Sequence, residues 1–573
     1  MALLYLCYGL KRLTLGIDFT DEGAYLSWPL RMLFGEKPFA AELGTLLRPF
    51  QAYLYLVFKI HPAMTLYEFR LLGWLLHLLS FCLLSTYLFH LSRKPLESPL
   101  VASVPFFVCH IFGLAPPSYN ISSSDFLLIA LSLRGLAAAN GSRWPTALNI
   151  AGGFALFLGT LAHPVLGLVG AAILLYELIG CDLVQNLFHR RLTPSNMGAL
   201  VFVACWLAFA GYLVAIGAHA VWFQRMSLFQ SLAVQSHKVS PVLFYLQLFG
   251  YPFAFSRFAL LFTLAAFTGG GVLLHASRTR NERRAATAAA LLALLLIVSL
   301  IYNFSYDPGH LPICLAQAAL ILLGLHCLGC TASLLPIATT TRFSLLLSGL
   351  AAVAYATVTF YFSPFRSWIS GILALPFAFA TGLTLLLGVQ PGRFQSLFRT
   401  LSFLALVLAV ACVAREHYRS IYRDATVDEL RATFRLPKLR HIRSTQERVD
   451  AIDALYEHLH PKLARGEPLL VFDDCPMLYY LFDAMPAYGL TFATRYTQSP
   501  MALRQLNQEL NAKPLPQYAI RTLVDVSESV WATARQSTYN DYPLNETVMA
   551  NYELEKTIFP FEIWRMKTAD PRK

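Results

Sequence analysis

Long apolar stretches recur along the first three quarters of the chain, and short polar loops separate them. Many of these stretches reach about 18 residues or more, which is enough for a helix to cross a bilayer. Hydropathy predicts roughly thirteen spans, one over about residues 2–15 and the others centred near residues 80, 106, 132, 155, 172, 207, 267, 293, 320, 352, 378 and 407. The pattern predicts a polytopic α-helical membrane protein.

Composition supports this class. The 573 residues are 56% hydrophobic and 14% charged, and their mean hydropathy is +0.52. A soluble protein of this length would carry more charge. The net charge of +12 does not indicate nucleic acid, because most of the excess sits in short loops. The first apolar stretch is short and contains Lys11 and Arg12. It is either a shallow helix or the remainder of a longer one, and we favour a start codon upstream of Met1.

Positive residues predict the orientation of the spans. Basic clusters at residues 93–94, 189–191, 278–284, 342 and 393–399 fall in alternate loops, which we expect to face the cytoplasm. The other loops then face outward, and they include residues 18–22, 118–125, 163–164, 219–241, 303–310 and 363–368. The same alternation places the C-terminal tail outside.

The tail differs from the rest of the chain in its ordinary hydropathy and higher charge. We expect a transmembrane domain over residues 1–415 and a small extracytoplasmic α/β domain over residues 416–573. Within the tail, the pattern predicts a helix over 449–463, a strand over 467–473, a turn and helix over 476–482, and a hairpin-like strand pair over 551–566.

Three carboxylates, Asp18, Asp21 and Glu22, lie within five residues beside the first span. Such groups are costly near a membrane and are kept there mainly for function. One interpretation is a solvated acidic loop. Another is a general base, because a base needs a carboxylate near the acceptor hydroxyl. A third is a divalent cation, Mg or Mn, held by Asp18 and Glu22, because hard cations bind clustered oxygens. The spacing does not choose among them.

Other predicted outer loops carry further polar candidates. Asp125 either caps a helix or acts on the same side as Asp21. Arg48 is either an interfacial anchor or a cation for a phosphate. His163 precedes a proline, which favours a simple turn, whereas His310 opens a predicted span and can contact an anionic group. No P-loop is present.

The order of these features resembles GT-C fold glycosyltransferases. It is similar to the bacterial branch that includes the aminoarabinose transferase of lipid A and the protein O-mannosyltransferase-like enzymes. The resemblance rests on the motif Asp21-Glu22-Gly-Ala-Tyr25, on Asp125-Phe-Leu-Leu, on Arg48-Pro-Phe-Gln as a variant of Lys-Pro-Pro-Leu, and loosely on His310-Leu-Pro. About thirteen spans followed by an outer soluble domain also match that family.

The resemblance implies an inverting transferase that takes a sugar from a polyprenyl-phosphate donor on the outer side of the membrane. The acceptor would be an envelope lipid, glycan or protein. The lack of paired Cys and of targeting signals favours a bacterial inner membrane with a periplasmic site over an endoplasmic reticulum membrane, where the enzyme would face the lumen with the same topology. Asp21 would be the base and Asp125 would orient the acceptor or the base. Arg48, His310 or a metal would balance the leaving phosphate. Tyr25 and His163 complete the expected substrate-binding set.

Two other classes of protein remain open at this stage. A lipid or solute transporter or flippase would also have many spans, but transporters commonly show internal repeats and broken helices near the midplane. A non-catalytic scaffold would tolerate neutral substitutions at Asp21 and Asp125. An oligosaccharide ligase or polymerase is a further variant of the enzyme. The clustering of polar groups at one predicted face favours an enzyme.

Overall fold

The computed structural model describes residues 1–36, 49–50, 54–108, 116–138, 143–163, 193–220, 395–419, 421–472, 475–488, 512–536 and 543–567, besides a few isolated positions. The predicted spans near residues 172, 267, 293, 320, 352 and 378 fall almost entirely outside these residues, so the number thirteen stays a prediction.

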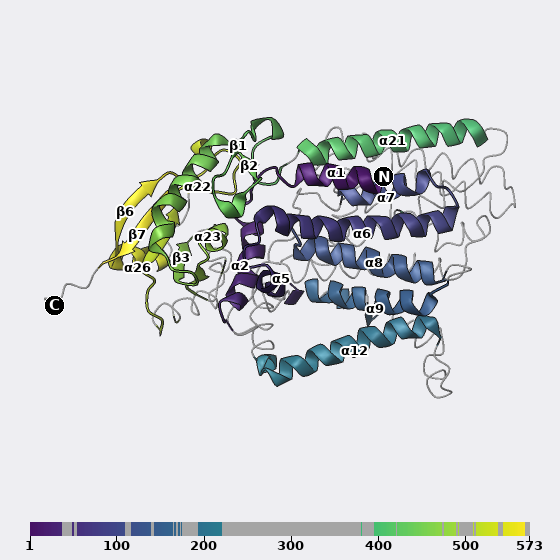
Figure 1. Ribbon diagram of the computed structural model, residues 1–573, viewed down its shortest axis with the longest axis horizontal. Helices are drawn as coiled ribbons and strands as arrows, with labels where there is room; N and C mark the ends of the chain where they lie inside the picture. Colours follow the sequence, from purple (N-terminus) through teal and green to yellow (C-terminus); the bar gives the residue numbers. More distant parts are fainter. Residues whose placement is uncertain are drawn as a thin grey trace, which may run out of the picture.

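A row of long helices occupies one side of the structure, at the right in Figure 1. It contains α6 (Leu66–Ser92), α8 (Tyr119–Ala138), α9 (Pro145–Ala162) and α12 (Pro194–Ala215), each packed on the next. On the other side of α6 lie α1 (Ala2–Arg12) and α7 (Glu97–Val108), and α21 (Gln395–Arg419) packs on α7. Most neighbours in the row are also close in the sequence, whereas α21 packs on a helix that lies far before it in the chain.

Five described helices are long and apolar enough to cross a membrane: Leu66–Ser92, Ile121–Ala138, Pro145–Ala162, Asn196–Ala215 and Arg399–Arg419. They confirm the spans predicted near residues 80, 132, 155, 207 and 407, and they fit a membrane protein. The first predicted span, over residues 2–15, is instead an 11-residue helix that ends at Arg12. It ends there because the chain turns so that Leu15 and Gly16 can pair with Arg443 of the tail.

The two ends of the row differ in character. At one end the tail meets the acidic loop, and Tyr422 donates a hydrogen bond to Asp21. At the other end, Arg399 pairs with Glu97 at 3.4 Å, close to the basic residues that follow α6. The predicted outer loop and the tail therefore share one end, and predicted cytoplasmic residues share the other.

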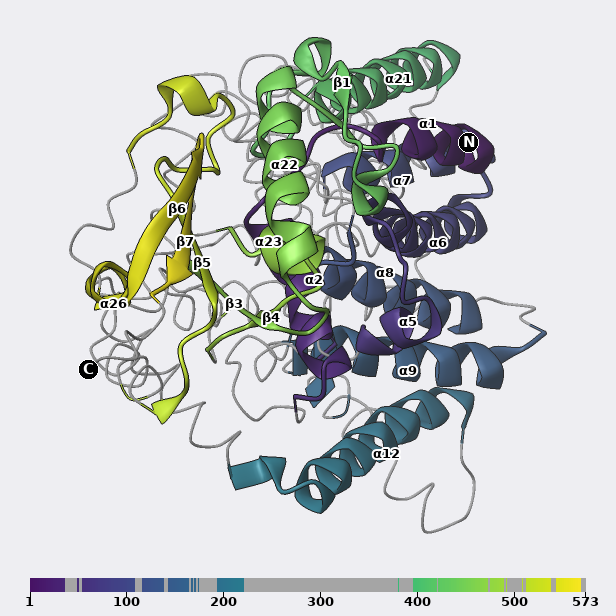
Figure 2. The same ribbon diagram turned by 60° about the vertical axis from the view of Figure 1, so that its left-hand side comes forward.

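The described tail contains a five-stranded mixed sheet of order β4-β3-β5-β7-β6 (Figure 2). The strands are β3 (Pro468–Phe472), β4 (Met485–Pro486), β5 (Tyr518–Thr522), β6 (Tyr552–Ile558) and β7 (Phe561–Met566). Strand β3 runs parallel to β4 and β5, whereas β7 is antiparallel to β5 and β6. A separate pair joins β1 (Ala432–Thr433) and β2 (Arg443–Ser444). The remaining tail elements are α22 (Gln446–Leu459), α23 (Met477–Leu481), α26 (Pro543–Asn551) and the short 3-10 helices Val427–Glu429, Pro437–Leu439, His460–Lys462 and Trp531–Thr533.

These tail elements confirm the local predictions. The predicted strand over 467–473 is β3, the helix over 476–482 is α23, the helix over 449–463 is α22, and the hairpin over 551–566 is β6 and β7. The division of the chain at residue 415 stays a prediction, and α21 continues past it to Arg419.

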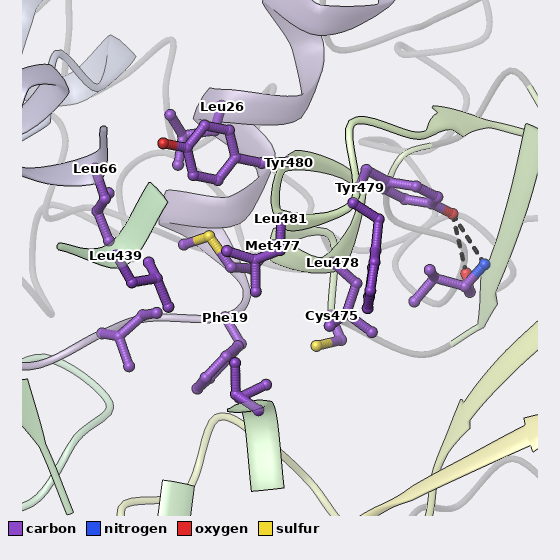
Figure 3. Packing of buried hydrophobic residues seen from close by; sticks show 14 of the residues in the cluster. Phe19, Leu26, Leu66, Leu439, Cys475, Met477, Leu478, Tyr479, Tyr480 and Leu481 are labelled. Carbon is purple, nitrogen blue, oxygen red and sulfur yellow. Dashed lines mark hydrogen bonds between the residues drawn. The ribbon is translucent and has the colours of Figure 1, made fainter. Parts of the chain in front are cut away.

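Helix α2 (Asp21–Leu33) lies at the junction between the row of helices and the sheet (Figures 1 and 2), and α5 (Tyr55–Ile60) packs on it. The loop before α2, α2 itself, the start of α6 and the tail share one hydrophobic core (Figure 3), which includes Phe19, Leu26, Leu66 and Tyr480. Burial of such apolar surface is the dominant stabilising term in packing. The tail is therefore docked on the acidic loop.

Candidate functional site

The acidic loop is organised by Asp18, which caps helix α2. Its Oδ1 accepts hydrogen bonds from the Thr20 backbone N–H at 3.0 Å and hydroxyl at 2.7 Å, and its Oδ2 accepts from the Glu22 N–H at 3.0 Å. These bonds satisfy N–H groups at the helix start, which lack partners within the helix. The pKa of Asp18 is raised to about 6, mainly by burial; Arg423 opposes this shift and the neighbouring Asp21 carboxylate adds to it.

Glu22 is fully buried and paired with Arg70 on α6. Arg70 Nε lies 2.6 Å from Glu22 Oε1, and Nη2 lies 2.7 Å from Oε2, so the guanidinium binds the carboxylate in a bidentate manner. Arg70 also donates to the carbonyl oxygens of Leu13 at 2.8 Å and Gly16 at 2.8 Å. This pair fixes the path of the loop between α1 and α2.

Asp21 begins helix α2, and its carboxylate contacts the segment that follows α21. Tyr422 Oη donates to Asp21 Oδ2 at 2.7 Å, and Arg423 Nη1 lies 3.1 Å from the same oxygen. Burial, with the Asp21 carboxylate second, raises the pKa of Tyr422, so its hydroxyl stays protonated and donates. Sequence reasoning missed both Tyr422 and Arg423, because 401 residues separate Asp21 from Tyr422.

The four predicted carboxylates differ in exposure. The Asp21 side chain is 17% exposed, whereas those of Asp18, Glu22 and Asp125 are 1%, 0% and 1% exposed. A base must reach the proton that it removes, directly or through one water. Of the four, Asp21 is the carboxylate that another molecule can reach in this structure.

Asp125 lies inside the row of helices, where it pairs with His77 of α6. His77 Nδ1 lies 2.7 Å from Asp125 Oδ1, and Ser80 Oγ donates to the same oxygen at 2.7 Å. His77 Nε2 donates to the Phe106 carbonyl at 2.7 Å, since a carbonyl oxygen only accepts. Asp125 thus joins α8 to α6 and, through His77, to α7. A histidine within an apolar helix is the signal that would have indicated this partner.

Tyr25 and His163 each lie against a third aromatic residue, Tyr119. The Tyr25 and Tyr119 ring centroids are 5.9 Å apart, and those of Tyr119 and His163 are 6.0 Å apart. The structure therefore groups two predicted substrate-binding residues at the ends of α2, α8 and α9 that face the tail. Arg48 and His310 lie outside the described residues, but Phe50 packs on Phe126, next to Asp125, with centroids 5.4 Å apart.

The carboxylate oxygens that were predicted to hold a divalent cation already bind other groups of the protein. Both oxygens of Glu22 bind Arg70, and both oxygens of Asp18 accept hydrogen bonds from the start of α2. Among the described residues, no group of three or more His, Cys, Asp or Glu side chains is placed to hold a metal ion. A metal at Asp18 and Glu22 would have to displace Arg70, so the arrangement does not fit the predicted cation.

Comparison with known proteins returns a structural likeness alone. No protein-family model matches the chain, and no curated protein matches it either. Among solved structures, ArnT from Cupriavidus metallidurans, bound to undecaprenyl phosphate, is similar with 14% identity and a TM-score of 0.41, covering 99% of this chain and 97% of that one. The apo state of the same protein gives 14% identity and a TM-score of 0.41, with 98% and 97% covered.

ArnT is a GT-C aminoarabinose transferase, so the search returns the kind of protein that the sequence motifs resemble.

Proposed function

We propose that this protein is an integral membrane glycosyltransferase that moves a sugar from a polyprenyl-phosphate donor to an envelope lipid, glycan or protein. The observation that carries the proposal is the placement of Asp21. It is a reachable carboxylate at the end of a row of apolar helices, beside a cation and beneath a docked tail. A lipid-linked donor suits this setting, because its chain can stay among apolar helices while its sugar phosphate reaches that end.

In the proposed reaction the acceptor hydroxyl attacks the anomeric carbon, and Asp21 takes the hydroxyl proton. The new carbon–oxygen bond forms on the face of the sugar opposite the bond between the anomeric carbon and the phosphate oxygen. That older bond breaks, its electron pair stays on the phosphate oxygen, and the configuration at the anomeric carbon is inverted. General-base help of this kind is typically worth about 10²–10⁴-fold. Cations beside the leaving phosphate stabilise its charge, and Arg48 and His310 remain the proposed groups for that task.

The other predicted residues are proposed to support Asp21. Glu22, paired with Arg70, and Asp18, bonded to the start of α2, hold the loop that carries the base. Asp125 ties α8 to α6, and Tyr119 at the start of α8 contacts both of the proposed substrate-binding residues, Tyr25 and His163. We place the site on the outer face of a bacterial inner membrane, because the basic loops are expected to face the cytoplasm.

The test is mass spectrometry of envelope glycolipids and glycans from cells with the gene, without it, and with the gene restored. Loss of one sugar residue on deletion, and its return on complementation, would support a transferase and identify both donor sugar and acceptor. An unchanged glycan profile, together with altered uptake of a lipid or solute, would refute the proposal and favour a transporter.

A further inference from the structure

Three consecutive residues, Tyr422, Arg423 and Asp424, follow the last described span and contact the acidic loop. Tyr422 and Arg423 both reach Asp21 Oδ2, at 2.7 and 3.1 Å. The third residue, Asp424, accepts a hydrogen bond from the Ile17 backbone N–H through Oδ2 at 2.8 Å. The start of the tail is therefore bonded to both ends of the loop that carries Asp21.

This segment is held in one conformation from the tail side. Asp424 Oδ2 also accepts from the Ser444 hydroxyl at 2.7 Å, and Oδ1 accepts from the Ala425 N–H at 2.8 Å. Arg423 has a φ of 55°, in the left-handed region that non-glycine residues adopt infrequently. Such conformations persist where the surroundings determine them, and they concentrate at functional sites.

Arg448 of α22 ties the same loop to the sheet side of the tail. Its Nη1 donates to the Ile17 carbonyl at 3.1 Å, and its Nη2 donates to the Glu528 carbonyl at 2.6 Å. The guanidinium also lies over the Trp531 ring, 4.9 Å from the centroid. Arg448 therefore connects the loop to two parts of the tail, and the geometry around Asp21 depends on both the loop and the tail.

The Arg423 guanidinium is fixed by several groups. Its carbon lies 4.6 Å from the centroid of the Tyr422 ring, Nη1 donates to the Thr20 hydroxyl, and Nη1 lies 3.7 Å from Asp18 Oδ1. The cation is thus shared between the capping carboxylate Asp18 and the reachable carboxylate Asp21. A cation held by three neighbours can define the orientation of a carboxylate that is itself partly exposed.

We propose that Tyr422 and Arg423 are positioning residues that hold the Asp21 carboxylate in the orientation needed for catalysis. This inference rests on the proposed function of Asp21. It assigns a role in the reaction to the start of the C-terminal tail, because the two residues set the direction from which Asp21 meets the acceptor hydroxyl. Neither residue is required to touch the substrate.

The test measures the rate of sugar transfer by purified full-length protein in lipid nanodiscs. The donor and acceptor fractions are those identified by mass spectrometry of the envelope glycolipids and glycans. Tyr422→Phe keeps the ring and removes one hydroxyl donor, so we expect kcat to fall about tenfold or more with little change in KM, as for the loss of a hydrogen bond to a charged group. Arg423→Gln should behave similarly, and Arg423→Lys should restore part of the rate because it returns the charge.

Two comparisons separate positioning from a merely structural role. In an Asp21→Asn background, adding Tyr422→Phe should cause little further loss, because residues that act through one another are not additive. Arg435→Gln is the matched control, since that arginine pairs with Asp453 at the tail surface with its side chain 71% exposed. The control should transfer at the normal rate.

Infrared difference spectra at one fixed pH provide a readout that does not need transfer. The spectrum of the normal protein minus that of Asp21→Asn isolates the Asp21 carboxylate band. Tyr422→Phe should shift this band, as expected for a carboxylate that has lost a hydrogen-bond donor, whereas Arg435→Gln should not. The inference would be overturned if Tyr422→Phe left the carboxylate band in place. It would also be overturned if the losses in transfer rate from Asp21→Asn and Tyr422→Phe multiplied fully in the double variant. Normal transfer by Asp21→Asn alone would instead refute the proposed role of Asp21 as the base.

Discussion

Helix α2 approaches the backbone of the tail at Gly23, and this contact gives a sharp test of the docked arrangement. A Cβ atom added at Gly23 would lie 2.2 Å from the Met477 nitrogen and 2.6 Å from its Cα. Ordinary carbon contacts are about 3.5–4.0 Å. Gly23→Ala must therefore push α2 and the start of α23 apart by roughly 1 Å or more, since the atoms that it meets belong to the backbone.

The cost can be worked from the contacts on either side. Separation would break the hydrogen bond from the Met477 N–H to the Phe19 carbonyl, 3.1 Å, and the one from the Ser27 hydroxyl to the Pro476 carbonyl, 2.7 Å. Each is worth about 0.5–1.5 kcal/mol, and overpacking costs about 1–3 kcal/mol. Alanine returns up to about 1 kcal/mol through its higher helix propensity. The net destabilisation is about 1–6 kcal/mol.

The assay is thermal unfolding in detergent, together with the rate at which a protease releases the tail. Gly23→Ala should lower the unfolding temperature and speed the release. Gly211→Ala is the matched control, because it makes the same change in a helix at a position with nothing within 4 Å of the added Cβ. The reasoning is wrong if the two variants unfold at the same temperature and release the tail at the same rate.

Two further predictions concern the carboxylates of the acidic loop. Arg70→Met should destabilise the protein by about 3–5 kcal/mol in chemical unfolding, because it leaves Glu22 buried without its cation. The control Arg399→Met removes an arginine that is 58% exposed and pairs with Glu97, and it should cost about 1 kcal/mol or less. Equal losses of stability would contradict the importance assigned to the buried Arg70–Glu22 pair. The pKa of Asp18 rises from 3.8 in the unfolded chain to about 6 on folding, so the folded state binds the Asp18 proton more tightly. The stabilisation that this proton provides is therefore complete below about pH 4 and is lost as the pH rises through about 6. The difference in unfolding free energy between normal protein and Asp18→Asn should therefore change by at most about 3 kcal/mol over that range; no change would contradict the raised pKa.

The local parts of the fold could be predicted because their signals are local. The strand of residues 468–472 is a short apolar run beside a glycine and a proline, and the hairpin of residues 552–566 turns at Pro560. The long apolar helices follow from hydropathy alone, because a bilayer sets their length. In each case the deciding residues lie within one window of sequence.

The partners within the site could not be predicted in the same way. Arg70 and His77 lie in a 27-residue apolar helix, and hydropathy averages over single polar residues. Tyr422 and Arg423 lie in an unremarkable charged stretch, far along the chain from Asp21. Their roles follow from docking of the tail on α2, which depends on a shared core rather than on a motif.

The sequence does not distinguish the three carboxylates of the acidic loop from one another. Asp18, Asp21 and Glu22 are equivalent as a cluster of charges, but folding separates them. Asp18 caps the helix, Glu22 is neutralised by Arg70, and Asp21 keeps a reachable carboxylate. Exposure and pairing, which the spacing does not contain, make this distinction.

Asp21 is proposed to be the base of a sugar transfer. The decisive test of this role is the rate of sugar transfer in washed membranes that contain equal amounts of normal protein, Asp21→Asn, or Asp450→Asn, which makes the same change at an exposed position of α22. Asp21→Asn should lose about 10²–10⁴-fold in rate while remaining folded in the membrane, and Asp450→Asn should transfer sugar normally. Near-normal transfer by Asp21→Asn would contradict this role.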